Sequence, residues 1–154
     1  MRLTTHTDYA MRLLMYAGRH PDRLCTISEI ASAYNISEPH LMKITHRLSQ
    51  HGWIETVRGK NGGMRLALPP DQINLGAVMR DTENDFKLVE CFAHGNSCTL
   101  SGQCHLTAII SDALQSFLGH LDRFSLADIL PDKDHSGPGG EQPLTFLPAA
   151  LGAS

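Results

Sequence analysis

Two short amphipathic segments joined by a three-residue turn constrain the fold of this chain more than any other feature. Thr26-Ile-Ser-Glu29 matches a capping box, in which the Thr26 hydroxyl accepts from the Glu29 amide and the Glu29 carboxylate reaches back. Apolar residues follow on one face, and then Asn35-Ile36-Ser37 forms a tight turn that places Ser37 to cap a further helix. The pattern predicts a helix-turn-helix.

A Gly-rich, basic hairpin is expected directly after these helices. Residues 53–57 and 64–68 have the composition of strands, and the second alternates apolar and polar side chains. The turn between them, Arg58-Gly-Lys-Asn-Gly-Gly63, carries two positive charges. With a helix expected over residues 7–20, the order predicts a winged helix-turn-helix, mainly α with a small β-hairpin wing.

One long helix is predicted near the end of the chain. Asn74 is placed to cap a short helix over about residues 75–80. Apolar residues then recur at three- and four-residue steps from Leu106 to Phe124. That face exceeds what a small domain covers, so we expect a dimer seam, because helix-turn-helix repressors normally pair; packing back on the winged helix is the plain alternative.

The expected organisation therefore has four parts. Residues 1–80 would form the DNA-binding domain, 81–105 a cysteine loop and 106–130 the dimerisation helix. From residue 131 the composition changes to PDKDHSGPGGEQP without periodicity, which predicts a disordered tail over 131–154.

Charge divides unevenly along the chain, although the formal net charge is only −3. Residues 1–70 hold nine Lys and Arg against five acids, whereas the remainder holds four against eleven. A basic N-terminal half suits phosphates, and this indicates double-stranded DNA as a partner. We expect Ser37, Glu38, His40 and Lys43 near bases, Arg47 near the DNA backbone, and Arg58 and Lys60 in the minor groove of A·T-rich DNA. A solvated surface is the plain alternative for any one of them.

Other classes of function lack their signals. No signal peptide and no membrane span are visible, so the cytoplasm is the expected compartment. We find no nucleophile–base arrangement, phosphate loop or paired carboxylates, and an enzyme is not expected. Because the cytoplasm is reducing, clustered cysteines indicate metal or redox chemistry, whereas the isolated Cys25 is expected to be a small buried apolar side chain.

Cys91, Cys98 and Cys104 are separated by six and five residues. Zinc sites usually use tighter pairs, so the wide spacing in a flexible loop favours an iron–sulfur cluster. Three thiolates leave one position without a cysteine. Candidates for it are Cys25, His94, His105 and the distant Asp8. Zinc bound by three Cys and one His remains an alternative, as does an unligated, redox-sensitive loop.

Three segments together resemble the Rrf-type winged-helix regulators, and among them the nitric-oxide-sensing repressors. These are MRLTTHTDYAMRLL, RGKNGGMRL and the three-cysteine loop after VECF, and the resemblance runs from residue 1 to about 130. It implies a homodimer whose long helices cross. It also implies a 4Fe–4S cluster on Cys91, Cys98 and Cys104, completed by Asp8 of the partner subunit, with a 2Fe–2S cluster or zinc as alternatives. Such a repressor would leave an A·T-rich palindromic operator when nitric oxide nitrosylates the cluster.

The resemblance has limits, and the residues add chemistry to it. A related regulator uses a histidine three residues after its last cysteine, where this chain has Thr107. A carboxylate is a poorer partner for cluster iron than thiolate, so Asp8 would be the labile ligand. Arg12, one turn later, is placed to pair with Asp8 when iron is absent, and losing the iron bond would alter the spacing of the recognition helices. For Asp8 the plain alternative is a helix N-terminal acid. The competing function is a zinc-stabilised winged-helix adaptor between proteins.

Overall fold

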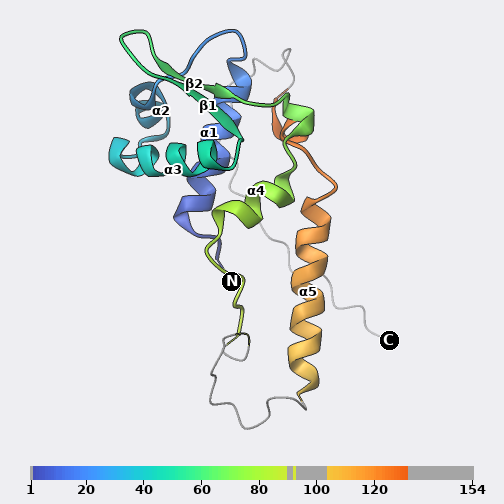
Figure 1. Ribbon diagram of the computed structural model, residues 1–154. Coiled ribbons are helices and arrows are strands. Elements are labelled where there is room, and N and C mark those ends of the chain that lie inside the picture. The colour runs from blue at the N-terminus through green and yellow to red at the C-terminus, as the bar shows by residue number, and fades with distance from the viewer. Residues whose placement is uncertain (1, 90–91, 93–103, 132–154) are drawn as a thin grey trace.

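The computed structural model describes residues 2–89, 92 and 104–131, and it confirms the predicted fold class (Figure 1). Four helices and a two-stranded hairpin gather in one half, and a long helix, α5, extends away from them. Cys91, Cys98 and the tail from residue 132 lie outside the described residues. None of the helices within the described ranges has the length and apolar character needed to cross a bilayer.

Helix α1 (Thr5–Arg19) contributes one face to the centre of the winged-helix unit. Its first turn is capped by Thr4, whose hydroxyl accepts from the Thr7 amide at 3.3 Å. Its fully buried side chains include Ala10, Leu13 and Leu14. The same helix contacts α2, α3, α4, the second strand and the last 3-10 turn, so it is a common point of attachment for the whole unit.

Helices α2 (Ile27–Tyr34) and α3 (Glu38–Gln50) form the predicted helix-turn-helix. The turn works because Asn35 adopts φ 53°, a left-handed conformation that Asn tolerates better than most residues. The capping box is confirmed: the Glu29 amide donates to Thr26 Oγ1, and the Thr26 hydroxyl donates to the Glu29 carboxylate, both at 3.2 Å.

Ser37 occupies the N-cap of α3 as expected, but its side chain makes no capping hydrogen bond. A cap of this kind accepts from the second or third amide of the helix. Pro39 has no amide to give at the second position, and the His40 amide bonds to the Ser37 carbonyl instead, at 3.1 Å. The Ser37 hydroxyl is therefore left at an exposed position.

The wing consists of β1 (Ile54–Val57) and β2 (Gly63–Leu66), antiparallel with Ile54 opposite Leu66. On the other edge of β2, Cys25 and Met64 exchange two backbone hydrogen bonds of 2.8 Å. A Cβ on Gly63 would lie 2.7 Å from the Cys25 carbonyl oxygen, so this pairing requires glycine there. Cys25 is fully buried, which confirms its structural role.

The chain then forms a short 3-10 turn, η1 (Pro70–Gln72), and α4 (Leu75–Thr82). Asn74 caps α4 as predicted, its Oδ1 accepting from the Ala77 amide at 2.9 Å. Helix α5 (His105–Leu121) ends earlier than the expected boundary at 130. The reason is tertiary, because the Leu75 amide bonds to the Phe124 carbonyl and the Leu126 amide to the Ile73 carbonyl. A second 3-10 turn, η3 (Leu126–Ile129), follows and buries Leu126 completely.

Two apolar clusters hold these elements together. The larger fills the winged-helix unit between α1, α2, α3, the hairpin and η3. The smaller joins α4 to α5 through Met79, Leu114 and Leu118, with Phe86 and Phe92 packed against it. Phe86 and Phe92 therefore extend the α4–α5 contact with residues that follow α4 in the chain.

Candidate DNA-binding surface and cysteine site

The exposed face of α3 lies opposite its fully buried stripe of Leu41, Ile44 and Leu48. Among the predicted base-reading residues, Ser37, Glu38 and Lys43 are exposed on it. Two residues that the sequence analysis did not select share this face: Met42, which is 57% exposed, and His46. The 3.6-residue helical period, projected from the buried stripe, places both on the exposed face.

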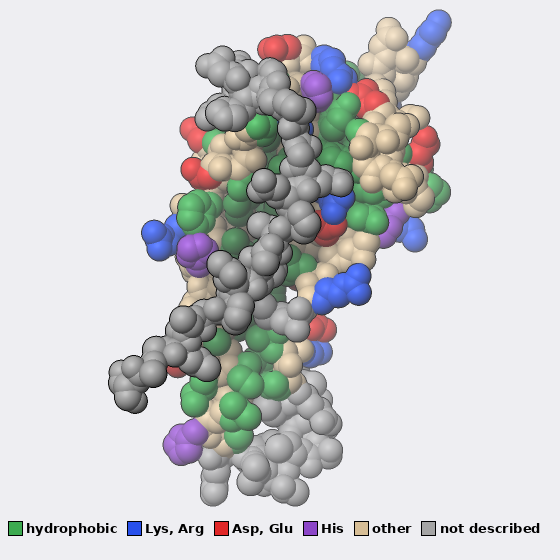
Figure 2. Space-filling model, turned by 180° about the vertical axis from the view of Figure 1, so that it is seen from behind, with side chains coloured by type: hydrophobic (Ala, Val, Ile, Leu, Met, Phe, Trp, Pro, Cys, Tyr) green, Lys and Arg blue, Asp and Glu red, His purple; other side chains and the backbone are tan. Residues whose placement is uncertain are grey.

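The wing places its two cations at the tip of the hairpin. Arg58 and Lys60 are exposed, and the turn between the strands passes through Gly59 at φ 107°. Figure 2 shows a basic side chain at the far end of this protruding arm. A thin arm with positive charge at its tip has a shape and charge that suit the narrow, negative minor groove of A·T-rich DNA.

His40 and Arg47 are placed differently from the rest of the predicted set. The His40 ring lies edge-on to Tyr9 of α1, with the ring centroids 5.1 Å apart. Arg47 donates from Nε to the Asp81 carbonyl at 2.7 Å and from Nη1 to Asn84 Oδ1 at 3.1 Å. Both side chains are half-buried and join α3 to other elements.

A polar junction surrounds the end of α4. Glu83 is buried, with 7% of its surface exposed. Its carboxylate accepts hydrogen bonds from the Thr4 amide at 2.8 Å and from the Thr4 hydroxyl at 3.2 Å. Beside it, His6 has a buried Nε2 without a hydrogen bond to any described residue. Burial lowers the pKa of His6, and the neighbouring charges of Arg47 and His40 lower it further, against the opposing effect of Glu83.

Asp8 lies one turn into α1, exposed and paired with Arg12. Their side chains are 3.0 Å apart and are 48% and 44% exposed. An ion pair this exposed contributes only about 0–1 kcal/mol. Asp8 is therefore available to a stronger partner at small cost.

Cys104 is the one predicted cysteine ligand within the described residues, and it stands at the start of α5. The Thr107 amide, the Thr107 side chain and the Leu106 amide hold the pKa of the Cys104 thiol below its usual value. The thiolate is the form that binds metal, so this environment fits the chemistry of an iron–sulfur or zinc ligand. In the described ranges, no three His, Cys, Asp or Glu side chains gather into a metal site, and Asp8 and Cys104 belong to separate parts of the protomer.

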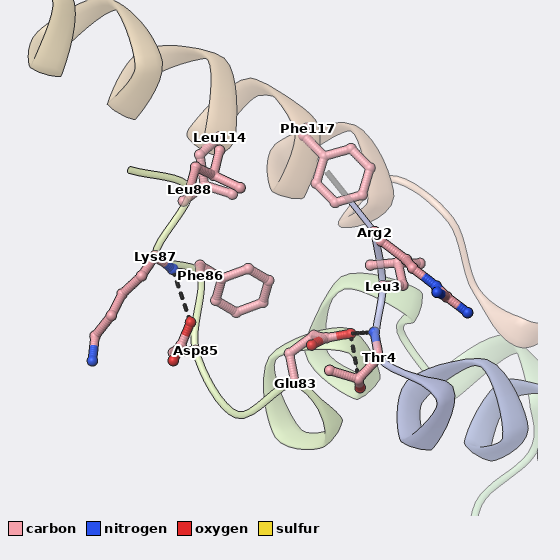
Figure 3. Close-up of a pocket in the computed structure, with 10 residues that line it drawn as sticks. All are labelled: Arg2, Leu3, Thr4, Glu83, Asp85, Phe86, Lys87, Leu88, Leu114 and Phe117. Carbon is pink, nitrogen blue, oxygen red and sulfur yellow. Dashed lines mark hydrogen bonds between the residues drawn. The ribbon is translucent and has the colours of Figure 1, made fainter. Parts of the chain in front are cut away.

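A cavity of about 260 Å³ lies between these parts (Figure 3). The chain's start, the segment after α4 and the inner face of α5 line it, and the Thr4–Glu83 hydrogen bonds form part of its wall. Phe86 and Phe117 project toward its interior, while Lys87 points away. The cavity therefore adjoins the segment that leads to Cys91.

Helix α5 has one covered edge and one open edge. Leu114 and Leu118 are buried against α4, but Leu106 and Ile109 are 59% and 64% exposed. Figure 2 shows apolar side chains gathered over the lower half of the molecule, where α5 lies. The packing-back alternative thus holds for part of the helix, and its first turns remain uncovered by described residues.

Comparison with known proteins gives a consistent result. A family model described as "Rrf2: Iron-dependent Transcriptional regulator" matches residues 3–132. The HTH-type transcriptional regulator NsrR of Geobacillus kaustophilus is 49% identical over 135 residues, covering 86% of this chain and 92% of that protein. NsrR of Bacillus subtilis is 45% identical over 136 residues, covering 87% and 93%. Among solved structures, IscR of T. potens superposes with a TM-score of 0.67 at 23% identity, covering 83% of this chain and 85% of that one, which shows a shared fold.

These relatives are transcriptional regulators rather than enzymes, and they match the chain through both the winged helix and the long helix. As a member of a family of transcriptional regulators, the chain has DNA as a partner. The chain belongs to the Rrf2 family of iron-dependent transcriptional regulators.

Proposed function

We propose that this chain is a homodimeric repressor that binds an A·T-rich palindromic operator in the cytoplasm and senses nitric oxide through a 4Fe–4S cluster. The observation that carries the proposal is the union of a winged helix with a three-cysteine segment in a chain nearly half identical to regulators named NsrR. A 2Fe–2S cluster remains the alternative centre. The expected ligands are Cys91, Cys98 and Cys104, with Asp8 of the partner subunit.

The described residues support this ligand set chemically. A thiol whose pKa is lowered, as at Cys104, offers the thiolate that iron requires. An exposed carboxylate held only by a surface ion pair, as at Asp8, is free to exchange partners. Bound there, the cluster would supply iron open to attack by a small diatomic ligand, and that is its contribution to sensing.

The protein's own residues account for the rest of the cycle. The Asp8–Arg12 ion pair is the arrangement that Asp8 would adopt when it is not a ligand, and binding to the cluster would be the alternative state of this turn of α1. The open edge of α5 supplies the seam that brings two winged helices to two half-sites. Arg58 and Lys60 then contact the minor groove, while the exposed Ser37, Glu38 and Lys43 face base edges.

Anaerobic purification followed by iron and sulfide analysis tests the proposal directly. We expect brown protein with about four irons per protomer that shifts an A·T-rich palindrome in a gel, and loss of the shift on adding nitric oxide. Asp8→Ala should keep dimer formation but weaken cluster retention, and Glu38→Gln serves as a control outside the cluster ligands. Colourless protein with stoichiometric zinc, binding a protein partner without any salt dependence, would instead establish the adaptor.

A further inference from the structure

Arg47 was expected at the DNA backbone, but its guanidinium is engaged with the end of α4. Nε donates to the Asp81 carbonyl at 2.7 Å, Nη2 to the Glu83 carbonyl at 3.4 Å and Nη1 to the Asn84 side chain at 3.1 Å. The last carbonyls of a helix have no partner within the helix, and they carry its negative dipole end. A guanidinium from α3 therefore caps α4 through both hydrogen bonding and charge.

A second set of bonds ties the same end of α4 to the same corner of the fold. Trp53 Nε1 donates to Asp81 Oδ2 at 2.8 Å, and His51 Nδ1 lies 3.3 Å from that oxygen. His51 and Trp53 directly follow α3 and precede β1. The recognition helix and the base of the wing are thus fastened to one short stretch, residues 81–84.

The opposite side of this stretch is fastened to the start of α1. The Glu83 carbonyl accepts a hydrogen bond from Arg47, whereas the Glu83 carboxylate accepts from the Thr4 amide and hydroxyl. Thr4 is the N-cap of α1 and stands one turn before Asp8. Glu83 therefore connects the helix that carries the proposed labile ligand with the helix that reads DNA.

We infer that Arg47 is a positioning residue that couples the cysteine segment to the recognition helix, and not a phosphate contact. This inference rests on the proposed function. Cys91 follows Asn84 by seven residues, so the covalent path from this cysteine back to the winged helix runs through the end of α4. The end of α4 can then move only by carrying α3 with it or by giving up the Arg47 bonds.

Two measurable quantities separate this role from a phosphate contact. A phosphate contact contributes to the salt dependence of DNA binding, so its removal lowers the slope of log affinity against log salt by about 0.9. A positioning residue leaves that slope intact but changes the ratio of the DNA affinities of cluster-loaded and cluster-free protein. Lys43, exposed on the same helix four residues earlier and expected near the bases, is the matched control, because a cation that enters the DNA also releases counterions and so contributes to the slope.

The experiment compares wild type, Arg47→Met and Lys43→Ala as full-length dimers, each with and without the cluster. Met keeps most of the aliphatic length of Arg47 and removes its donors. For Arg47→Met we expect the affinity ratio to fall to about 1, which is no coupling, with the salt slope unchanged. For Lys43→Ala we expect the reverse, a slope reduced by about 0.9 and a preserved ratio.

The one tryptophan of the chain gives a readout that needs neither DNA nor cluster. Because Trp53 bonds to Asp81 within the junction, its emission maximum should shift in cluster-free Arg47→Met and stay at the wild-type value in cluster-free Lys43→Ala. If Arg47→Met does not fold, Asn84→Ala removes one exposed partner of the guanidinium and should lower the affinity ratio partway.

Each outcome decides the matter. A wild-type ratio of 1 would remove the proposed cluster control and the inference with it. If the ratio of DNA affinities differs from 1 in wild type and is unchanged in Arg47→Met, the inference is overturned but the proposed function is not. The same holds for Asn84→Ala if that variant is used in place of Arg47→Met. A salt slope lowered in Arg47→Met would restore the residue to the DNA backbone.

Discussion

Replacing Leu106 and Ile109 together by Ala should dissociate the proposed dimer while leaving each winged helix folded. Full burial of a Leu or Ile side chain contributes about 1.5–3 kcal/mol. These two residues are 59% and 64% exposed in the protomer, so that share of their surface is available to a partner. Each truncation then costs about 1–2 kcal/mol of association, and two truncations in two copies cost roughly 4–8 kcal/mol, a weakening of about 10³ to 10⁶ in Kd.

Sedimentation velocity over a concentration series measures this effect, and urea unfolding checks the fold. The control is Gln115→Ala, an exposed position on the opposite face of α5, which should leave the dimer unchanged. The reasoning is refuted if the double variant remains dimeric at concentrations where the control is dimeric. A large loss of protomer stability without dissociation would equally show that this edge packs within one chain.

Further predictions concern DNA reading, pH and capping. Arg58→Ala should weaken binding to an A·T-rich operator and lower its salt slope by about 0.9, and an unaltered slope would place the wing away from DNA. Met42 should touch a thymine methyl, so replacing one thymine by deoxyuridine should weaken wild type but not Met42→Ala; equal losses in both would rule this out. The pKa of His6 in the folded protein lies below its ordinary 6.5, so the unfolded chain binds a proton more readily. The free energy of unfolding should therefore be unaffected by His6 above pH 6.5 and should decrease as the pH falls below 6.5. The decrease should be smaller in His6→Gln, as measured by urea unfolding of both proteins over a range of pH. Identical dependence of the unfolding free energy on pH in the two proteins would contradict this. Asn74→Ala should cost about 0.5–2 kcal/mol of unfolding free energy, and no loss would mean that the cap of α4 is dispensable.

Local features of the winged helix were predictable because each depends on residues close in sequence. The Thr26–Glu29 box, the turn at Asn35 and the Asn74 cap all involve partners within three residues or one turn. The burial of Cys25 also followed from its apolar character. Ser37 is the N-cap of α3 as predicted, but its side chain makes no capping hydrogen bond, and Pro39 has no amide N–H to donate to it.

The sequence predicts which residues the candidate site contains, but not how their side chains are arranged. Exposed cations at Lys43, Arg58 and Lys60 follow from helix periodicity and from a polar turn. The ring contact of His40 and the bonds of Arg47 depend on α1 and α4, which periodicity on α3 cannot place. The ligand set of Cys91, Cys98, Cys104 and Asp8 of the partner subunit stays a prediction.

The sequence alone determined the order of helices, the hairpin, the caps and the residues that carry charge, since these depend on spacing along a few turns. The tertiary structure decided which charges face outward and which hold the fold together. Arg47 meets Asp81 across 34 residues and Thr4 meets Glu83 across 79, distances along the chain over which no local pattern acts. It also ended α5 at Leu121, because backbone pairing with the start of α4 satisfied the next amides and carbonyls better than another helical turn could.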